Sequence, residues 1–310
     1  MSRLVNATAN VREDLVAAGL AVATFGLLVV GASVRVNGAG LACPDWPLCF
    51  GQVVPPIDVQ VGFEFGHRVL AGLISLGFLG LGGLLFLRGS RAARAVWGVA
   101  AVALLVQIVL GGLTVLHLLA EWTVASHLLT GNTFCSLLLI LALILRSERF
   151  AEVRAPVTLA MRAVAAPLVV LVPLQLLLGG FVAGSHAGLV CPAFPGCGTA
   201  DGVWFPTFSG LLGLQVTHRL VAWLLLGVAA LTAIVARGRR PALAVLAAVL
   251  LQASIGVANV LLRLPVEVTL LHTAGAALVA WTTVWTHWDL WRAPITTSAP
   301  EGAASVAGAK

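Results

Sequence analysis

The sequence predicts an all-α membrane protein, with eight transmembrane helices arranged as two tandem-duplicated four-helix bundles. Three observations support this fold class. Hydrophobic residues make up 60% of the 310 positions and charged residues only 10%, and the mean hydropathy is +1.03. The apolar residues gather into eight long runs, and several landmarks of the first half return in the second. A soluble globular domain has neither this composition nor runs of this length.

Each apolar run has roughly 20 residues, enough for a helix to cross a bilayer. The runs lie at 15–36, 65–87, 95–116, 122–145, 163–183, 211–236, 241–261 and 267–288. The first run is long and uninterrupted, so it is read as a membrane span rather than as a cleaved signal.

Four landmarks repeat in the same order at nearly one offset, which predicts a duplicated four-helix unit. With four spans per unit both copies face the same way, so their pseudo-twofold axis lies along the membrane normal. The offset is 148 for Cys43 and Cys191, 151 for His67 and His218, and 145 for two further pairs, Gln107-x3-Gly111 with Gln252-x3-Gly256 and His127 with His272.

The repeat divides the chain into five segments. They are a cytoplasmic lead (1–14), the N-terminal four-helix half (15–145), a cytoplasmic linker (146–162), the C-terminal four-helix half (163–288) and a tail (289–310). The tail is rich in Ala, Ser, Thr and Pro and is expected to be disordered.

The Lys and Arg residues are unequally divided between the two sides of the membrane. Of the 18 Lys and Arg residues, 14 fall in segments on the side of the two termini, and only Arg35, Arg68, Arg219 and Arg263 fall on the other. Positive residues concentrate in cytoplasmic loops, so both termini are predicted to be cytoplasmic and the protein to lie in the plasma membrane. This distribution indicates a lipid bilayer rather than a nucleic acid as the partner of the basic residues.

Four histidines begin the even-numbered helices, within about two turns of the outer ends: His67, His127, His218 and His272. Ionisable residues inside a membrane usually face the bundle interior and mark function. Two helices of each half offer one imidazole apiece, an arrangement that holds a haem iron from both sides. We therefore predict a histidine pair as metal ligands in each half.

Other metal sites fit less well. A di-iron carboxylate bundle needs Glu-x-x-His on two helices, whereas only Glu64-x-x-His67 is present. The chain has no His-Glu-x-x-His zinc motif and no Cys-x-x-Cys-His for covalent haem. A structural role is favoured for His117 and His186, which lie in outer turns without repeat counterparts, and for His287, which lies at the inner end of the last helix.

Two cysteine pairs have the same spacing and both face outward. In an oxidising compartment such thiols pair readily, so disulfides Cys43–Cys49 and Cys191–Cys197 are expected. Each can simply close its loop, and Cys43–Cys49 can also exchange with a redox partner. Cys135 lies inside an apolar run and is read as a packing residue.

Glu64 has no acidic counterpart, because the repeat has Gln215 at that position. A carboxylate beside a metal ligand in one half only suggests proton handling or stabilisation of positive charge. The alternative is a carboxylate favoured by the helix N-terminus. Arg68 and Arg219 follow the histidines and are candidates to bind haem propionates, or they are interfacial arginines.

These motifs resemble the haem A synthase family of bacteria and mitochondria over residues 15–288. The resemblance rests on Val34-Arg35-x2-Gly38-x-Gly40-Leu41-x-Cys43-Pro44-Asp45-Trp46-Pro47-x-Cys49, on Glu64-x-x-His67-Arg68, on Gly111-Gly112-Leu113-Thr114-Val115 and on the other three histidines. His117 with Glu121, in the turn before the fourth helix, has no role that we can assign from the family.

The resemblance implies an oxidoreductase that converts haem O to haem A, by oxidising a porphyrin methyl to a formyl group for use in terminal oxidases. It implies that His67, His127 and Glu64 form the catalytic half, and that His218 and His272 hold a haem b that relays electrons. It also implies a haem O-supplying synthase and terminal oxidase assembly factors as partners.

Two alternatives come from other classes of protein. A di-haem b-type cytochrome that only transfers electrons would need neither Glu64 nor any difference between the halves. A transporter built on parallel repeats would need ionisable residues at mid-membrane depth, which the apolar runs lack.

Overall fold

The computed structural model describes residues 12–150, 153–197 and 207–296, and within these ranges it is built from helices. Eight helices are long and apolar enough to cross a membrane when α6 and α7 are taken as one span, so the predicted all-α membrane fold is confirmed. The helices are α2 (Glu13–Val36), α3 (Val59–Arg88), α4 (Arg91–Leu116), α5 (Glu121–Arg149), α6 (Leu159–Ala165), α7 (Leu168–Gly184), α8 (Gly210–Val235), α9 (Arg240–Leu261) and α10 (Val266–Arg292), with a short 3₁₀ turn η2 (Ala187–Leu189).

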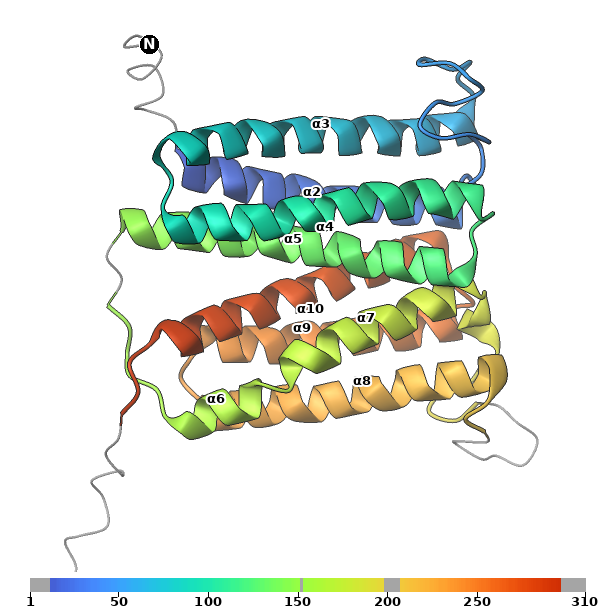
Figure 1. Cartoon of the computed structure of the whole chain (residues 1–310). Helices are drawn as coiled ribbons and strands as arrows, with labels where there is room; N and C mark the ends of the chain where they lie inside the picture. The colour runs from blue at the N-terminus through green and yellow to red at the C-terminus, as the bar shows by residue number, and fades with distance from the viewer. Residues whose placement is uncertain (1–11, 151–152, 198–206, 297–310) are drawn as a thin grey trace, which may run out of the picture.

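The long helices run side by side, with α2–α5 in one group and α6–α10 in the other (Figure 1). Contacts between the groups join α2 to α10 and α5 to both α7 and α10. The order of the helices does not conflict with the predicted duplication, which stays a prediction.

Two glycines let α7 approach α5 closely. A Cβ at Gly180 would lie 2.7 Å from the Cα of Ala125, and one at Gly184 would lie 3.0 Å from the Cα of Glu121. Small residues permit such approaches between helices in lipid, where packing rather than water exclusion drives association. Across the same interface Phe25 packs against Trp281, with ring centroids 5.1 Å apart.

Three helix boundaries differ from the sequence expectation. α3 starts at Val59 rather than 65, because the Asp58 side chain accepts the Val61 N–H at 2.8 Å and caps the helix. The fifth span is interrupted between Ala165 and Leu168, where Pro167 lacks the N–H that a continuous helix would use.

The third difference concerns the end of the chain. Residues 289–296, expected to belong to a disordered tail, are ordered: α10 continues to Arg292, and the Thr296 N–H donates to the Val157 carbonyl at 2.9 Å. The remainder of the tail, 297–310, lies outside the described residues, as do 1–11 of the N-terminal lead.

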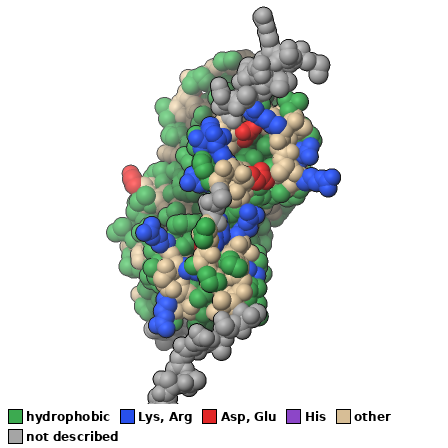
Figure 2. All heavy atoms as spheres, turned by 90° about the vertical axis from the view of Figure 1, so that its left-hand side faces the viewer, with side chains coloured by type: hydrophobic (Ala, Val, Ile, Leu, Met, Phe, Trp, Pro, Cys, Tyr) green, Lys and Arg blue, Asp and Glu red, His purple; other side chains and the backbone are tan. Residues whose placement is uncertain are grey.

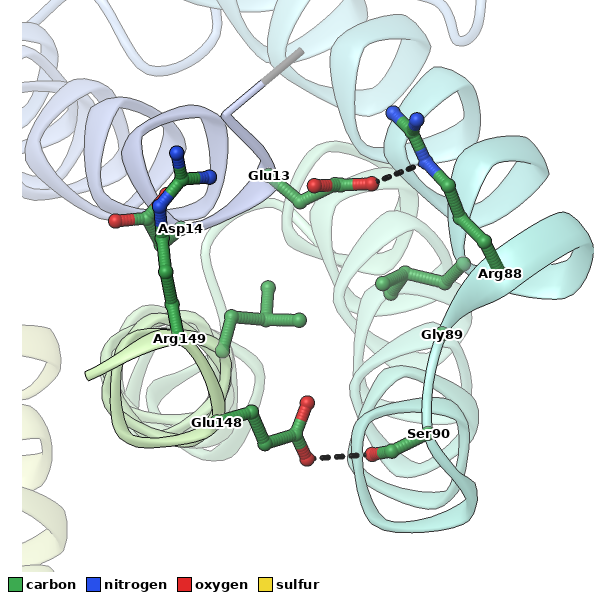
Figure 3. Close-up of a pocket in the computed structure, with 9 residues that line it drawn as sticks. Glu13, Asp14, Arg88, Gly89, Ser90, Glu148 and Arg149 are labelled. Carbon is green, nitrogen blue, oxygen red and sulfur yellow. Dashed lines mark hydrogen bonds and ion pairs between the residues drawn. The ribbon is translucent and has the colours of Figure 1, made fainter. Parts of the chain in front are cut away.

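One end of the bundle carries most of the described arginines (Figure 2). In the first half, polar contacts at this end join the loop between α3 and α4 to its neighbours (Figure 3). Glu13 pairs with Arg88 at 2.5 Å, and the Ser90 hydroxyl donates to Glu148 at 2.6 Å. These residues line a cavity of about 220 Å³.

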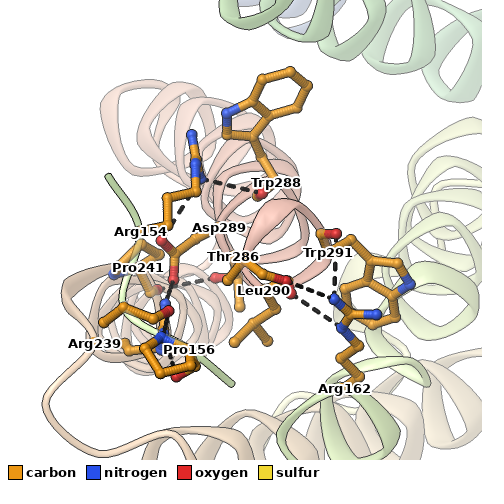
Figure 4. A network of polar contacts seen from close by, with 12 residues as sticks. Arg154, Pro156, Arg162, Arg239, Pro241, Thr286, Trp288, Asp289, Leu290 and Trp291 are labelled. Atoms are coloured by element: carbon orange, nitrogen blue, oxygen red, sulfur yellow. Dashed lines mark hydrogen bonds and ion pairs between the residues drawn. The ribbon is translucent and has the colours of Figure 1, made fainter. Parts of the chain in front are cut away.

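In the second half, a larger network binds the inner linker to the end of α10 (Figure 4). Arg162 donates to the carbonyls of Leu290 at 3.1 Å and Ala293 at 2.9 Å. Arg239 pairs with Asp289 at 2.6 Å. Arg239 also donates to the Pro156 carbonyl at 3.0 Å, so the linker is attached to the last helix through Arg239 as well as through Arg162.

Candidate haem sites at the outer end

The four predicted histidines lie in α3, α5, α8 and α10, near the ends of these helices that lie opposite the arginine-rich end, which are called here the outer ends. Each imidazole packs against a glycine of the preceding long helix, where a Cβ would come within 3.0–3.2 Å of the ring atom Cε1. The pairs are Gly31–His67, Gly111–His127, Gly179–His218 and Gly256–His272. A Cβ at these positions would be tight enough that the ring would have to shift by a few tenths of an ångström, so glycine permits the close approach of each imidazole to its neighbouring helix.

A glutamine side chain also contacts three of the four rings. The Nε2 atom of Gln107 lies 3.3 Å from Nε2 of His127, and that of Gln175 lies 3.4 Å from Nε2 of His218. Gln252 Nε2 lies 3.2 Å from Nδ1 of His272. In the sequence Gln107 and Gln252 serve only as landmarks of the repeat, so their contact with the candidate ligands was missed.

The buried nitrogens of these rings fit a metal-binding role. Within the described residues, Nδ1 of His67, His127 and His218 is buried without a hydrogen-bond partner. Buried polar atoms are normally paired, and exceptions need an explanation. His67 and His127 lie close enough to interact electrostatically, as do His218 and His272, so each half brings its predicted pair together.

The donor set suits a porphyrin-bound iron better than a bare ion. No group of three or more His, Cys, Asp or Glu side chains that could hold a metal ion occurs in the part of the chain that the structure describes. A haem iron takes only its axial ligands from the protein. One pair of imidazoles in each half is a donor set that would suit a haem, and haem binding at these residues stays a prediction.

Glu64 attaches the first outer loop to α3. Its side chain is 5% exposed, Oε2 accepts the Cys43 N–H at 2.8 Å, and Oε1 pairs with Arg68 at 2.5 Å. Arg68 also donates to the carbonyls of Asp45 at 2.9 Å and Leu48 at 2.7 Å. Glu64 and Arg68 thus form one buried polar cluster with the loop.

The second half repeats this arrangement with an amide, Gln215, in place of the carboxylate. Gln215 donates to the Gly188 carbonyl at 3.2 Å, and Arg219 donates to the carbonyls of Cys191 at 2.7 Å, Ala193 at 2.9 Å and Gly196 at 3.0 Å. The arginines expected to bind propionates therefore hold loop carbonyls with their terminal nitrogens.

Both expected disulfides are present, Cys43–Cys49 and Cys191–Cys197. All four cysteines are buried, and each pair packs on its following helix, at Val61 and Val216 respectively. Cys135 is a buried free thiol, as expected for a packing residue.

The first outer loop also reaches α4, the third helix of its half. Trp46 lies over Gly112, where a Cβ would come within 3.0 Å of the indole ring. Gly111 packs against the ring of His127 and Gly112 packs against the ring of Trp46, so each of the two adjacent glycines contacts one ring. The loop that Glu64 holds therefore extends across the outer end of the N-terminal half.

Of the remaining candidates, Arg35 ends α2 and lies within electrostatic range of His272 in the other half. His117 packs edge-on against Trp122, and His186 precedes η2 with a positive φ of 55°. The Nδ1 atom of His287 lies 2.8 Å from the Thr283 carbonyl. Neither His117 nor His186 joins the histidine pairs, and His287 lies near the other end of α10.

Comparison with known proteins finds relatives that match most of the chain. The chain is 30% identical over 321 residues to a protein named heme A synthase from Shewanella oneidensis, covering 88% of this chain and 96% of that one. It is also 30% identical to heme A synthases from Methylobacterium sp. strain 4-46, with 84% and 87% of the two chains covered, and from Methylorubrum extorquens strain PA1, with 92% and 88% covered.

The family described as COX15-CtaA, cytochrome oxidase assembly protein, matches residues 15–62 and 59–284. The two matched segments together span α2 to α10 and include all four histidines. With eight candidate membrane spans and paired imidazoles in each half, the chain belongs to the COX15-CtaA family of cytochrome oxidase assembly proteins.

Proposed function

We propose that this multi-pass membrane protein is a haem A synthase, an oxidoreductase that converts haem O to haem A by oxidising one porphyrin methyl group to a formyl group. The observation that carries the proposal is that each half has two imidazoles, each packed against a glycine of a neighbouring helix. The relatives that match most of the chain are named heme A synthase, which supports this reaction over electron transfer alone.

The two halves have different roles in this proposal. The N-terminal half (15–145) binds the substrate haem O through His67 and His127, and the C-terminal half (163–288) binds a haem b through His218 and His272. A bound haem b supplies one-electron redox chemistry, which suits an electron relay. The acid at position 64, where the repeat has Gln215, supports catalysis in the N-terminal half.

Glu64 is the proposed proton-handling group beside the substrate. Its carboxylate lies one helical turn before His67, and its hydrogen bonds to Cys43 and Arg68 hold it in place. A carboxylate fixed in this way can accept a proton or stabilise developing positive charge at the methyl carbon. Propionate binding by Arg68 and Arg219 stays a prediction, and we propose that both arginines also keep the outer loops folded over the sites.

The distribution of charge supports a plasma-membrane location with both termini in the cytoplasm, since the arginine-rich end in Figure 2 is the end at which the chain enters α2 and leaves α10. A haem O-supplying synthase and terminal oxidase assembly factors are the proposed partners, because haem O and haem A must be received and passed on.

The test uses membranes from cells that make haem O but have no haem A synthase of their own. When this protein is produced in them, extraction and mass analysis of the porphyrins are expected to detect the formyl-bearing haem A. Membranes with His67→Ala serve as the control and should retain haem O. A protein that binds haem in both halves but yields no formyl-haem would be a di-haem cytochrome, and the proposal would be wrong.

A further inference from the structure

An apolar groove between α2 and α3 begins beside the His67 site and opens toward the lipid. It has a volume of about 520 Å³ and is lined only by Leu, Ile, Val, Ala and Gly side chains, among them Gly26, Leu27 and Val30 of α2 and Leu70, Leu73 and Ile74 of α3. The two helices lie next to each other along the outer edge of the first group (Figure 1).

The lining of the groove comes within one residue of the candidate substrate site on α2 and within one helical turn of it on α3. Val30 directly precedes Gly31, the residue against which His67 packs. On α3, Leu70 follows His67 by three residues and therefore shares its face of the helix. Ile74 lies seven residues beyond His67, about 10 Å deeper along the helix axis. The groove thus lies directly below the level of His67 on α3 and extends deeper along the helix.

No polar side chain lines the groove, and the two halves differ in the residue found at one of the lining positions. Gly31 corresponds to Gly179 at an offset of 148 (179 − 31), and the same offset relates Leu27 to Gln175 (175 − 27). Gln175 contacts His218 in the C-terminal half, whereas Leu27 lines the groove in the N-terminal half. A glutamine is therefore replaced by leucine only in the half that we assign to the substrate.

We infer that this groove binds the long isoprenoid tail of the substrate, while His67 and His127 hold the porphyrin. The inference rests on the proposed function, since haem O differs from haem B by that tail. A tail leaving the porphyrin edge needs an apolar path, and burial of its methylene groups favours binding roughly in proportion to their number. The groove therefore selects a tailed haem over an untailed one.

The test measures binding rather than turnover. Protein is produced in cells that lack haem O, so that the N-terminal site can be titrated by absorbance with haem O or with haem B. Wild-type protein is expected to bind haem O more tightly. Gly26→Leu should reduce the ratio of the two affinities at least about tenfold, because the loss of burial for two methylene groups already has that effect.

Gly26 suits this test because no atom lies within 4 Å of an added Cβ, so the larger side chain enters the groove without displacing the helices. Gly26→Ala, a smaller change, should reduce the ratio less. Gly80→Leu is the matched control: it lies on α3 outside the groove and is equally free of neighbours. Retained haem in the C-terminal half reports that each variant is folded.

An unchanged affinity ratio in folded Gly26→Leu protein would overturn the inference and leave the groove to a lipid acyl chain. That result is distinct from failure of the proposed function, which wild-type membranes report through the absence of haem A. Equal losses of haem O and haem B affinity would also overturn it, since they would mean that the substitution disturbs the porphyrin site rather than the tail.

Discussion

Glu64 and Gln215 occupy matching positions but attach their loops differently. Glu64 accepts an N–H from Cys43, while Gln215 donates to the Gly188 carbonyl. Both are buried, and only Glu64 carries an acid. A buried carboxylate that has no partner destabilises the folded protein, and the guanidinium of Arg68 is the partner of Glu64. The difference makes position 64 the sharpest single-residue test of where catalysis occurs.

Glu64→Gln is expected to keep its haem spectrum and to lower the rate of haem A formation by about 10²–10⁴-fold, the usual contribution of one acid–base group. The amide keeps the shape and one acceptor oxygen for Cys43 but removes the charge and the proton site. Rates are measured by extracting haems at intervals. Haem whose methyl group has been oxidised only as far as the alcohol should accumulate.

Gln215→Glu is the matched control in the other half and should leave haem A formation near the wild-type rate. If Glu64→Gln forms haem A at the normal rate, Glu64 serves only to hold the loop. The argument for placing catalysis in the N-terminal half would then be lost.

At the level of single residues, the sequence predicted the four candidate histidines and both disulfides. It did not predict which residues pack against the imidazole rings. Ionisable residues and cysteines stand out in apolar runs, so they are easily found. Gly31 has no pattern of its own, because its contact with His67 depends on how α2 and α3 cross. The duplicated Gln107 and Gln252 were visible, yet nothing in their spacing indicated the ring contacts.

The helices of the protein pack in pairs, and in each pair a helix that carries a glycine closely approaches a helix that carries a histidine. α2 packs on α3, α4 on α5, α7 on α8 and α9 on α10, each with one glycine facing one imidazole. Each ring position is thus set by two helices together, and a change on the helix without the histidine should empty the site.

Gly31→Val tests this at the first helix pair. Its branched side chain would meet the His67 ring, since even a Cβ lies 3.1 Å from Cε1. We expect the N-terminal site to lose most of its haem while the C-terminal site stays filled, as measured by haem content per chain. Gly19→Val on the same helix, where no atom lies within 4 Å of the Cβ, should bind like wild type; equal occupancy in both variants would contradict the pairing.

The apolar runs predicted all eight spans but located some of their ends poorly. The early start of α3 follows from the Asp58 cap, a signal that the run of apolar residues does not contain. The break between α6 and α7 occurs at Pro167, and the conformational restriction before proline could have indicated it. Length and hydropathy find a span, whereas caps and prolines determine its boundaries.

On the scale of the whole molecule, two similar halves meet along α2, α5, α7 and α10. Residues of each half pack into the other: Leu128 of α5 contacts the core of the second half, and Trp281 of α10 contacts that of the first. Arg35 lies near His272 across the same boundary. The halves are therefore joined closely, although each has its own histidine pair.

His218→Ala tests whether the sites are nevertheless separate. The C-terminal site should lose its haem, while the N-terminal site remains able to bind haem through His67 and His127. Haem content per chain should fall by about half, and a titration with haem O should still saturate. His117→Ala, outside both pairs, is the control, and loss of both haems in folded His218→Ala protein would contradict two independent sites.

The contacts between the inner linker and the end of α10 bear on how the chain is synthesised. Arg162 and its partners at Leu290 and Ala293 are 128 and 131 residues apart, so at ordinary rates of translation the linker leaves the ribosome on the order of 10 s before they do. During that interval the nascent linker has no carbonyls of α10 to bind. The C-terminal half can therefore close only after its last helix has been inserted, and a chain released before Ala293 would lack that final docking step.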